Sequence, residues 1–522
     1  MNQMTKTAIF AGLAAVVSLA AIVTRPGEVK IDSGDLVGKN LFPSFDDPFA
    51  AKSLKVVEYN AELGESKSFE VAQLNNQWVI PSHHNYPADA ADRLKEAATL
   101  LLDLEVISKV SDDASSHELY GVVEPAENTE PGKKGVGKLI QLENEKGDRL
   151  AQIVVGAEVP EKSNLRHVRV PGQSAVYVVE IDPSKVSTKF EDWIEQDLLK
   201  LNAFDLAHVE IRDYSVQPTV TPQGIAVDYQ QRLDMTVNWD STESKWLLKE
   251  LKESRGNGLE TVQLMESEEL NTKKLDDMKR ALDELKIVNV EPKPAGLGED
   301  LKADRGIQQN RESMMSLMDQ GFFPVGMGGG DSVELLSSDG EVIAVTKDAV
   351  RYTLRFGRIA ASAGDEEENS KLNRFVMVTA EVDEQSLPEP TLEEVPDVDA
   401  AGQSAEESVA EEGAAEEGAA EEGADADAAK AARQAERDRI LKENQRKNDE
   451  YKDKRQKAAD KVRELNYRFA DWYYVIGEDV YKNIHLARAD VVQEKDIPVD
   501  EQTGIDAFRA LEEKGLKRGD QP

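Results

Sequence analysis

The chain has 522 residues, a formal net charge of −38 and no cysteine. This length exceeds what one compact core usually holds, so we expect two or three domains. The charge argues against nucleic acid as a partner, because a polyanion would be repelled. The absence of cysteine excludes disulfides, thiolate metal sites, a cysteine nucleophile and a lipoprotein anchor.

The amino-terminal segment, residues 1–30, is predicted to anchor the protein in a membrane. Residues 7–24 form an uncharged run of 18 residues. At ~1.5 Å per residue, such a helix just spans a bilayer core of about 30 Å. A cleaved signal peptide is the alternative, since Ser18 and Ala20 form a small-x-small cleavage pattern. In either case the body is predicted to lie outside the cytoplasm.

A first α+β unit is predicted over residues 31–202. Apolar residues that alternate or cluster predict its strands and hairpins, and apolar residues three and four apart predict a helix that starts near Pro87. A second helix, from about residue 184 to residue 200, contains Trp193 and closes the unit. The predicted strands are residues 54–59, 69–72, 78–80, 139–143, 150–155, 167–170 and 175–180.

The same order of elements recurs over residues 203–383. Trp246 lies in a strand that matches the strand of Trp78, and the run 372–378 matches the run 164–170. We therefore predict an α+β protein with two tandem related units of antiparallel sheet plus helix. The predicted elements are strands at residues 207–213, 235–238, 245–248, 333–337, 342–345, 352–356 and 375–382, and a helix near residues 270–285.

An insertion splits the second unit. In the first unit, the strand that begins at His167 is followed after a short turn by its hairpin partner. The matching partner in the second unit is predicted to be residues 472–477, so residues 384–465 interrupt a hairpin. Loop-closure entropy grows only slowly with length, which makes such an insertion tolerable. Residues 466–495 are predicted to complete the unit, and residues 496–522 to form a tail.

The insertion has two parts of different composition. Residues 384–429 are acidic, with Glu-Glu pairs that recur every five residues among Ala and Gly, and they are predicted to be a disordered linker. Residues 430–465 contain 13 basic and eight acidic residues without Gly or Pro, and are predicted to form a charged helix. This helix is either a solvated helix held by ion pairs, an arm for a partner, or a basic surface that folds back on the acidic tract. A coiled coil is disfavoured, because no sustained apolar seam is present.

No residue is predicted to be catalytic, to bind a cofactor or to ligate a metal, and the protein is predicted not to be an enzyme. His83 and His84 are adjacent, so on a strand they would point to opposite faces. The glycine-rich run 326–331 lacks the Gly-Lys-Ser/Thr ending of a phosphate loop. We interpret it as a connector between strands, like the run 132–137 in the first unit. The alternative to a non-enzymatic protein is an enzyme such as a hydrolase.

Several features resemble the bacterial domain-of-unknown-function 4340 (DUF4340) family, whose members are membrane-anchored and carry one or two such repeats. The features are the anchor, the runs 41–45 and 119–122, the strand with Gln77 and Trp78, and the run 472–476. The resemblance covers most of residues 41–492 apart from the insertion. It implies partners among ABC-transporter components of the gliding-motility auxiliary type, and it supplies no catalytic residues.

We therefore expect a membrane-anchored, extracytoplasmic accessory or scaffold protein that is a non-catalytic partner of an ABC-type transport system. Its expected partners are the membrane or auxiliary subunits of the transporter, and the inner membrane itself through residues 7–24. The alternative is a cell-envelope structural or binding module that acts without a transporter, through its acidic tract. The acidic tract and the charged helix depart from the family's usual pattern, so their role lies outside what the resemblance implies.

Overall fold

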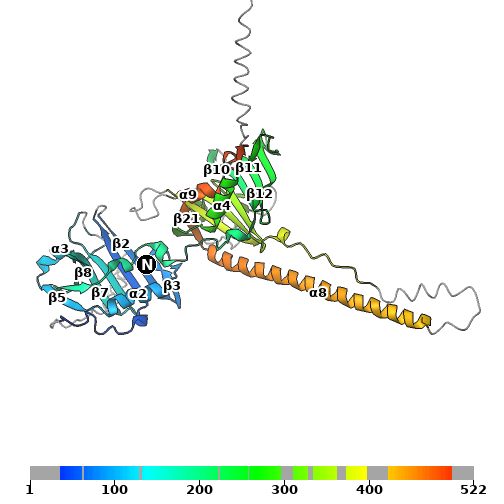
Figure 1. Ribbon diagram of the computed structural model, residues 1–522. Coiled ribbons are helices and arrows are strands. Elements are labelled where there is room, and N and C mark those ends of the chain that lie inside the picture. Colours follow the sequence, from blue (N-terminus) through cyan, green and yellow to red (C-terminus); the bar gives the residue numbers. More distant parts are fainter. Residues whose placement is uncertain are drawn as a thin grey trace, which may run out of the picture. The chain divides into compact units, whose positions relative to one another are not determined.

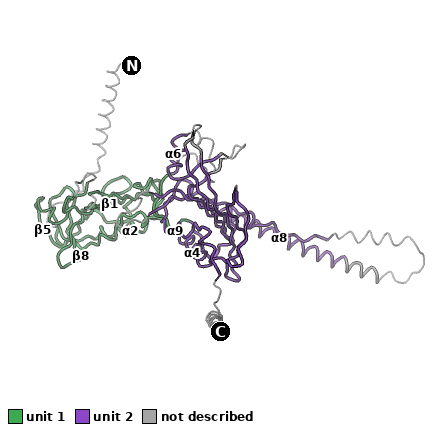
Figure 2. Tube along the Cα trace, turned by 90° about the horizontal axis from the view of Figure 1, so that it is seen from above, with its two compact units in different colours: residues 1–198, 286–292, 362–371 green, residues 199–285, 293–361, 372–522 purple. Residues whose placement is uncertain are grey.

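The computed structural model describes residues 36–61, 64–126, 129, 132–221, 224–256, 258–294, 310–326, 333–360, 372–396 and 421–495. The chain forms two compact units, the first built mainly from residues up to 198 and the second mainly from residues after 198 (Figure 2). The predicted anchor at residues 7–24, the acidic residues 397–420 and the tail at 496–522 lie outside the described residues. Among the helices that are described, none is long and apolar enough to cross a membrane.

The first unit is built on a nine-stranded antiparallel sheet in the order β4-β3-β2-β1-β6-β7-β8-β9-β5. Its strands are β1 (Ser53–Asn60), β2 (Glu65–Leu74), β3 (Gln77–Ile80), β4 (Tyr86–Pro87), β5 (Val106–Ser111), β6 (Lys138–Glu143), β7 (Arg149–Val159), β8 (Lys162–Arg169) and β9 (Val176–Glu180). Its helices are α2 (Ala91–Leu102) and α3 (His117–Tyr120), with 3-10 turns η1 (Pro48–Ala50), η2 (Pro81–His83), η3 (Ala114–Ser116), η4 (Pro183–Lys185) and η5 (Phe190–Trp193).

The core of the first unit follows from the spacing of its apolar residues. In β1, Leu54 and Val56 are fully buried while Lys55 between them stays partly exposed, as expected for a strand whose side chains alternate between faces. The helix α2 buries Leu94, Ala97, Ala98 and Leu101, which lie on one side because residues three and four apart are neighbours on a helix. Burial of this apolar surface, at roughly 25 cal/mol per Å², is what holds α2 in place.

The second nine-stranded antiparallel sheet has the order β13-β12-β11-β10-β18-β19-β20-β21-β15. Its strands are β10 (Leu206–Thr221), β11 (Gly224–Asp240), β12 (Lys245–Arg255), β13 (Gly258–Thr261), β15 (Asn289–Pro292), β18 (Glu341–Thr346), β19 (Val350–Ala360), β20 (Asn373–Val382) and β21 (Trp472–Gly477). Two small sheets accompany it, β14 (Glu268–Leu270) with β22 (Val492–Glu494) and β16 (Phe322–Gly326) with β17 (Val333–Ser337). The helices here are α4 (Thr272–Asp283), α6 (Arg311–Asp319), α8 (Glu421–Phe469), α9 (Glu478–Ile484) and α10 (Arg488–Val491), with 3-10 turns η6 (Ala203–Asp205) and η8 (Glu384–Ser386).

The two large sheets share one strand order, so that β1 corresponds to β10, β8 to β20, β9 to β21 and β5 to β15. Their register agrees as well. Val168 of β8 lies opposite Tyr177 of β9, and Val376 of β20 lies opposite Tyr474 of β21. The pairing of β20 with β21 confirms that residues 472–477 are the hairpin partner predicted across the insertion.

One predicted helix is absent. Residues 184–200 were expected to form a helix, but the structure has only the turns η4 and η5 there, with extended backbone at Val186. Side-chain donors take the carbonyls that a helix would use. Lys138 donates to the carbonyl of Val186 (2.7 Å), and the indole of Trp193 donates to that of Ser187 (3.1 Å). Trp193 itself is buried at 1% exposure, as a core residue.

Other elements are longer than predicted or were not predicted. Strand β10 continues past residue 213 through a bulge between Asp213 and Tyr214, where the alternation of apolar residues is broken. The helix α8 begins at Glu421 and ends at Phe469, beyond both limits of the predicted 430–465. Strands β5, β15 and β16 and helices α6 and α9 were not predicted from the sequence.

Candidate interaction site

A charged helix and an extended segment lie side by side in the second unit. Figure 1 shows α8 leaving the sheet as a single long helix, with the chain that follows β20 running along it. This extended segment, residues 384–396, is called the strap below. Asp383 precedes the strap, and its carboxylate accepts a hydrogen bond from the backbone N–H of Ser386 (3.1 Å) and so caps the turn η8.

An apolar contact fixes the beginning of the strap. Leu387 is only 8% exposed and packs against Ala349 and Ala458, with Tyr451 and Val382 partly buried around them. Ala458 belongs to α8, and its small side chain lets the strap approach the helix closely. A larger residue here would have to displace the strap, because well-packed interiors tolerate added volume poorly.

Asn444 of α8 binds the strap by its backbone. Its side chain accepts a hydrogen bond from the N–H of Glu393 (2.9 Å) and donates one to the carbonyl of the same residue (2.8 Å). A side-chain amide carries the same donor and acceptor as a peptide group. Asn444, which is 8% exposed, therefore pairs with the strap as a neighbouring strand would.

Asn466 repeats this arrangement about six turns further along α8. Its side chain accepts from the N–H of Ala380 (2.9 Å) and donates to the carbonyl of Ala380 (2.8 Å). Ala380 belongs to β20, so this contact joins the last part of α8 to the sheet. Both asparagines form hydrogen bonds with backbone atoms. They hold one face of α8 against the chain between Ala380 and Glu393.

Ion pairs along α8 contribute less to its stability than the contacts of Leu387 and Asn444. Lys447 approaches Glu393 (3.2 Å) and Arg455 approaches Glu384 (2.9 Å). Lys461 approaches Asp348 in the turn between β18 and β19 (2.9 Å). At least one partner in each pair is well exposed. Exposed pairs of this kind contribute ~0–1 kcal/mol each, so the apolar contact of Leu387 and the two hydrogen bonds of Asn444 hold the strap.

The carboxyl end of α8 is fixed by a half-buried lysine. The ammonium of Lys293 donates to the carbonyl of Phe469 (2.8 Å), and the backbone N–H of Lys293 donates to that of Asp471 (2.8 Å). Burial lowers the pKa of Lys293 to about 7, although the nearby carboxylate of Asp471 acts in the opposite direction. A donor at this position satisfies a carbonyl that the helix leaves free, and a cation is favoured there by the helix dipole.

A buried ionic network attaches α9 to the second sheet. Arg374, which is 6% exposed, donates to both carboxylate oxygens of Glu478 (2.7 and 3.2 Å) and contacts Asp339 (2.8 Å). Its guanidinium also lies over the ring of Tyr481, 4.0 Å from the centroid. Arg374 of β20 therefore links α9 to the turn that precedes β18.

The network continues to a buried histidine. The ring of His485 stacks on Tyr481, whose hydroxyl lies 3.2 Å from the Nδ1 atom of His485. Burial lowers the pKa of His485, against the opposing effect of Asp213 at 3.8 Å from Nε2. Gly340 passes so close to this ring that an added Cβ would lie 2.5 Å from Nε2.

The other histidines are spread over the two units. His83 stacks on Phe190 (4.4 Å between ring centroids), and burial lowers the pKa of His83 to about 4. His117 and His167 each bond a backbone carbonyl, at 2.9 and 3.0 Å. Within the described ranges, no three His, Asp or Glu residues gather as a metal site would require.

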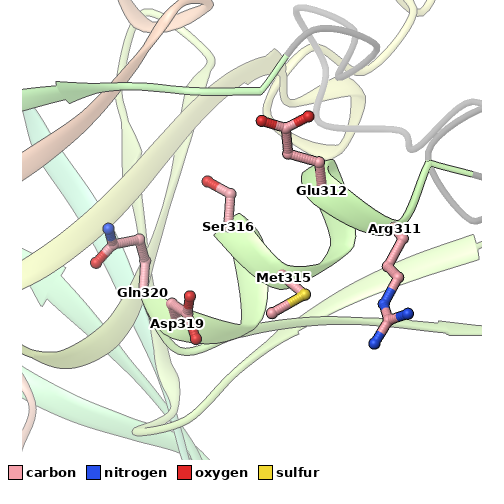
Figure 3. Close-up of a pocket in the computed structure, with 6 residues that line it drawn as sticks. All are labelled: Arg311, Glu312, Met315, Ser316, Asp319 and Gln320. Atoms are coloured by element: carbon pink, nitrogen blue, oxygen red, sulfur yellow. The ribbon is translucent and has the colours of Figure 1, made fainter.

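One surface depression, of about 570 Å³, lies along α6 (Figure 3). All of its lining side chains come from this helix and the residue that follows it: Arg311, Glu312, Met315, Ser316, Asp319 and Gln320. A binding pocket gains its affinity from groups that converge from several elements. This depression lacks such convergence, because its side chains stand along a single helix.

The glycine-rich run 326–331 joins two strands. Gly326 at the end of β16 pairs with Val333 at the start of β17, so the run is the connector that the sequence predicted, and its residues 327–331 lie outside the described residues. A phosphate loop would instead lead from a strand into a helix.

Sequence reasoning missed the strap. Residues 384–396 were assigned to the acidic linker, yet they contact α8 from Leu387 to Glu393. A signal was present in α8, where Asn444, Tyr451, Ala458 and Leu465 recur every seven residues. This seam is neither uniformly apolar nor matched to a second helix, and it accommodates an extended chain instead.

In comparisons with known proteins, one family model matches a segment that includes strands of both large sheets. The model described as "Domain of unknown function (DUF4340)" matches residues 78–305, from Trp78 in β3 to beyond β15. The resemblance seen in the sequence is thereby confirmed for these residues. Comparisons with curated proteins and with solved structures found no match.

Proposed function

We propose, from the DUF4340 domain that residues 78–305 carry, that this chain is a membrane-anchored accessory or scaffold protein. Its body lies outside the cytoplasm, and it is a non-catalytic partner of an ABC-type transport system. The uncharged run 7–24 supports the anchor. The transporter partner rests on the family resemblance, which implies transport components of the gliding-motility auxiliary type.

The observation that carries the scaffold role is the arm formed by α8 and the strap. Asn444 and Leu387 bind the strap to one face of α8, and Asn466 joins the same helix to β20. Lys430 to Arg439 are exposed on the part of α8 that continues beyond the strap. Ordering a long charged helix and a strap against each other costs conformational entropy. Such an element is typical of proteins that contact others over an extended surface.

The two nine-stranded sheets are tandem related units in this proposal. Their identical strand order and the matched register of the β8–β9 and β20–β21 hairpins support a duplication. The arm is then an addition to the second unit alone, placed where the first unit has the short turn between Arg169 and Val176. A scaffold with two similar bodies offers two similar surfaces to its partners.

Labelling of a single introduced cysteine tests the location of the body. The chain has no cysteine of its own, and Lys146 lies exposed in the turn between β6 and β7, so Lys146→Cys provides one accessible thiol. A membrane-impermeant maleimide added to spheroplasts is expected to label this variant without lysis. Labelling only after lysis would show a cytoplasmic body and overturn the proposal.

A second candidate is a cell-envelope binding module that acts through its arm without a transporter. The exposed, charged end of α8 favours it. Replacing residues 390–455 by a short Gly/Ser linker removes most of the arm and keeps its root, because Leu387, Ala458 and Asn466 remain. This candidate would be favoured if the variant stays folded but shows the same cellular defect as a deletion of the whole gene, and if no transporter subunit co-purifies with the full chain.

A further inference from the structure

The exposed end of α8 carries a row of cations on the face that the strap covers further along. Arg433 lies seven residues before Ile440, and Arg437 lies seven residues before Asn444. Residues seven apart lie on the same side of a helix. Ile440 and Asn444 are 7% and 8% exposed, so the row Lys430, Arg433 and Arg437 extends this buried face beyond the end of the strap.

The cations of this row are not neutralised within the described part of the second unit. Arg433 and Arg437 are exposed and make no ion pair there, whereas Arg439 pairs with Glu436 (2.6 Å). Lys430, Arg433 and Arg437 follow one another at spacings of three and four residues, so they form one stripe. It is called the basic stripe below.

The strap shows what kind of chain α8 binds on this face. The strap is acidic and extended, and its residue Glu393 approaches Lys447 at 3.2 Å and Arg439 at 4.0 Å. The direction of the strap leads the chain toward the basic stripe, because β20 lies near the carboxyl end of α8 and Glu393 lies beside Asn444.

The next residues of the chain, 397–420, match the stripe in charge and in position. They contain eight acidic residues and no Lys or Arg, and they connect the strap to the start of α8 at Glu421. From Asn444 back to Glu421 the helix measures about 35 Å, while 24 residues can span up to about 80 Å. Both ends of this acidic tract thus lie beside the stretch of helix that bears the stripe.

We propose that the acidic tract, residues 397–420, docks on the basic stripe of α8 and continues the path of the strap. Tethering at both ends raises the local concentration of carboxylates at the stripe to the millimolar range typical of short linkers. The pairs are exposed and therefore salt-sensitive. The docked tract shields Lys430, Arg433 and Arg437 from acidic groups of other proteins, which must displace it to reach them.

Spin labels on the full chain in detergent test this proposal. The labels are attached at Ser408→Cys in the tract and Gln434→Cys on α8, in a chain with no other cysteine. At low salt we expect a population at short distance. This population is expected to be lost at 1 M salt, where the Debye length is ~3 Å, and in the variant Arg433→Glu/Arg437→Glu.

The matched control is Lys442→Glu/Lys457→Glu, which makes the same change in net charge on another side of α8. It is expected to keep the short distance. Equal distance distributions in the wild type and the Arg433/Arg437 variant, or equal losses in the variant and the control, would overturn the proposal. If circular dichroism shows that charge reversal melts the end of α8, Arg433→Gln/Arg437→Gln removes the charges without adding repulsion and decides the question.

Discussion

The side chain of Asn466 accepts a hydrogen bond from the N–H of Ala380 and donates one to its carbonyl, although Ala380 lies 86 positions earlier in the chain. Ala380 lies opposite Tyr352 of β19 on its other side, so the asparagine stands where a further residue of β21 would pair. The carboxyl-terminal part of α8 is therefore joined to the second sheet beside β20.

Replacing Asn466 by alanine is expected to destabilise the second unit by about 2 kcal/mol. The change leaves a buried N–H and a buried carbonyl of Ala380 without partners, and each such group costs ~1–3 kcal/mol. Urea unfolding measures the free energy, and hydrogen exchange at the Ala380 amide reports the local effect. Gln445→Ala, at an exposed position of the same helix, is the control and should change the free energy of unfolding by less than ~0.5 kcal/mol. Equal effects of the two substitutions would contradict the role given to Asn466.

Replacing Asn444 by alanine is expected to release the strap while the sheet stays folded. Asn444 holds the backbone of Glu393, and cleavage by a glutamate-specific protease requires that this backbone open. We expect faster cleavage after Glu393 or Glu394, with little change in the urea midpoint. Gln445→Ala alters the neighbouring exposed position and serves as the control. A strap equally resistant to the protease in both variants would show that Asn444 is dispensable.

Lys293 is expected to make the stability of the second unit pH-dependent. Burial lowers its pKa to about 7 in the folded chain, against ~10.4 when unfolded. Between these values the unfolded chain binds a proton that the folded chain lacks, so stability rises with pH across this window. The stability difference between wild type and Lys293→Met should therefore move in favour of the wild type from pH 7 to pH 10. An unchanged difference in urea midpoint over this range would contradict the pKa.

The pair of Arg374 and Glu478 is expected to matter far more than an exposed pair of similar geometry. Glu478→Gln leaves a buried guanidinium with a weaker partner, and breaking a buried pair costs ~3–5 kcal/mol. Glu450→Gln breaks the exposed contact of Arg446 with Glu450 (2.6 Å) and should cost no more than ~1 kcal/mol. Urea unfolding of both variants gives the comparison, and equal losses would mean that Arg374 does not hold α9.

The hairpin across the insertion was predictable because it rests on local patterns. The apolar runs of β20 and β21 repeat those of β8 and β9. The register of two paired strands is strongly specified when one face of their sheet is buried. The charged helix was predictable for a similar reason, since a long stretch without Gly or Pro favours helix whatever surrounds it.

The strap and the false helix at residues 184–200 depend on distant contacts. Asn444 reads backbone atoms of Glu393, which any residue presents, so the strap's own sequence gives no sign of the pairing. In residues 184–200, where a helix was predicted, the carbonyl of Val186 accepts a hydrogen bond from Lys138 of β6. Such tertiary donors override local propensity. The anchor at residues 7–24 lies outside the described residues, and it remains a prediction from the sequence.

Quantitative co-purification tests the scaffold role most directly. The tagged full chain is recovered from detergent-solubilised membranes, and associated proteins are measured by mass spectrometry. The chain with residues 390–455 replaced by a Gly/Ser linker is treated in parallel. We expect ABC-transporter membrane or auxiliary subunits to be enriched with the full chain over an untagged control. Recovery of the full chain without any transporter subunit would contradict the proposed function.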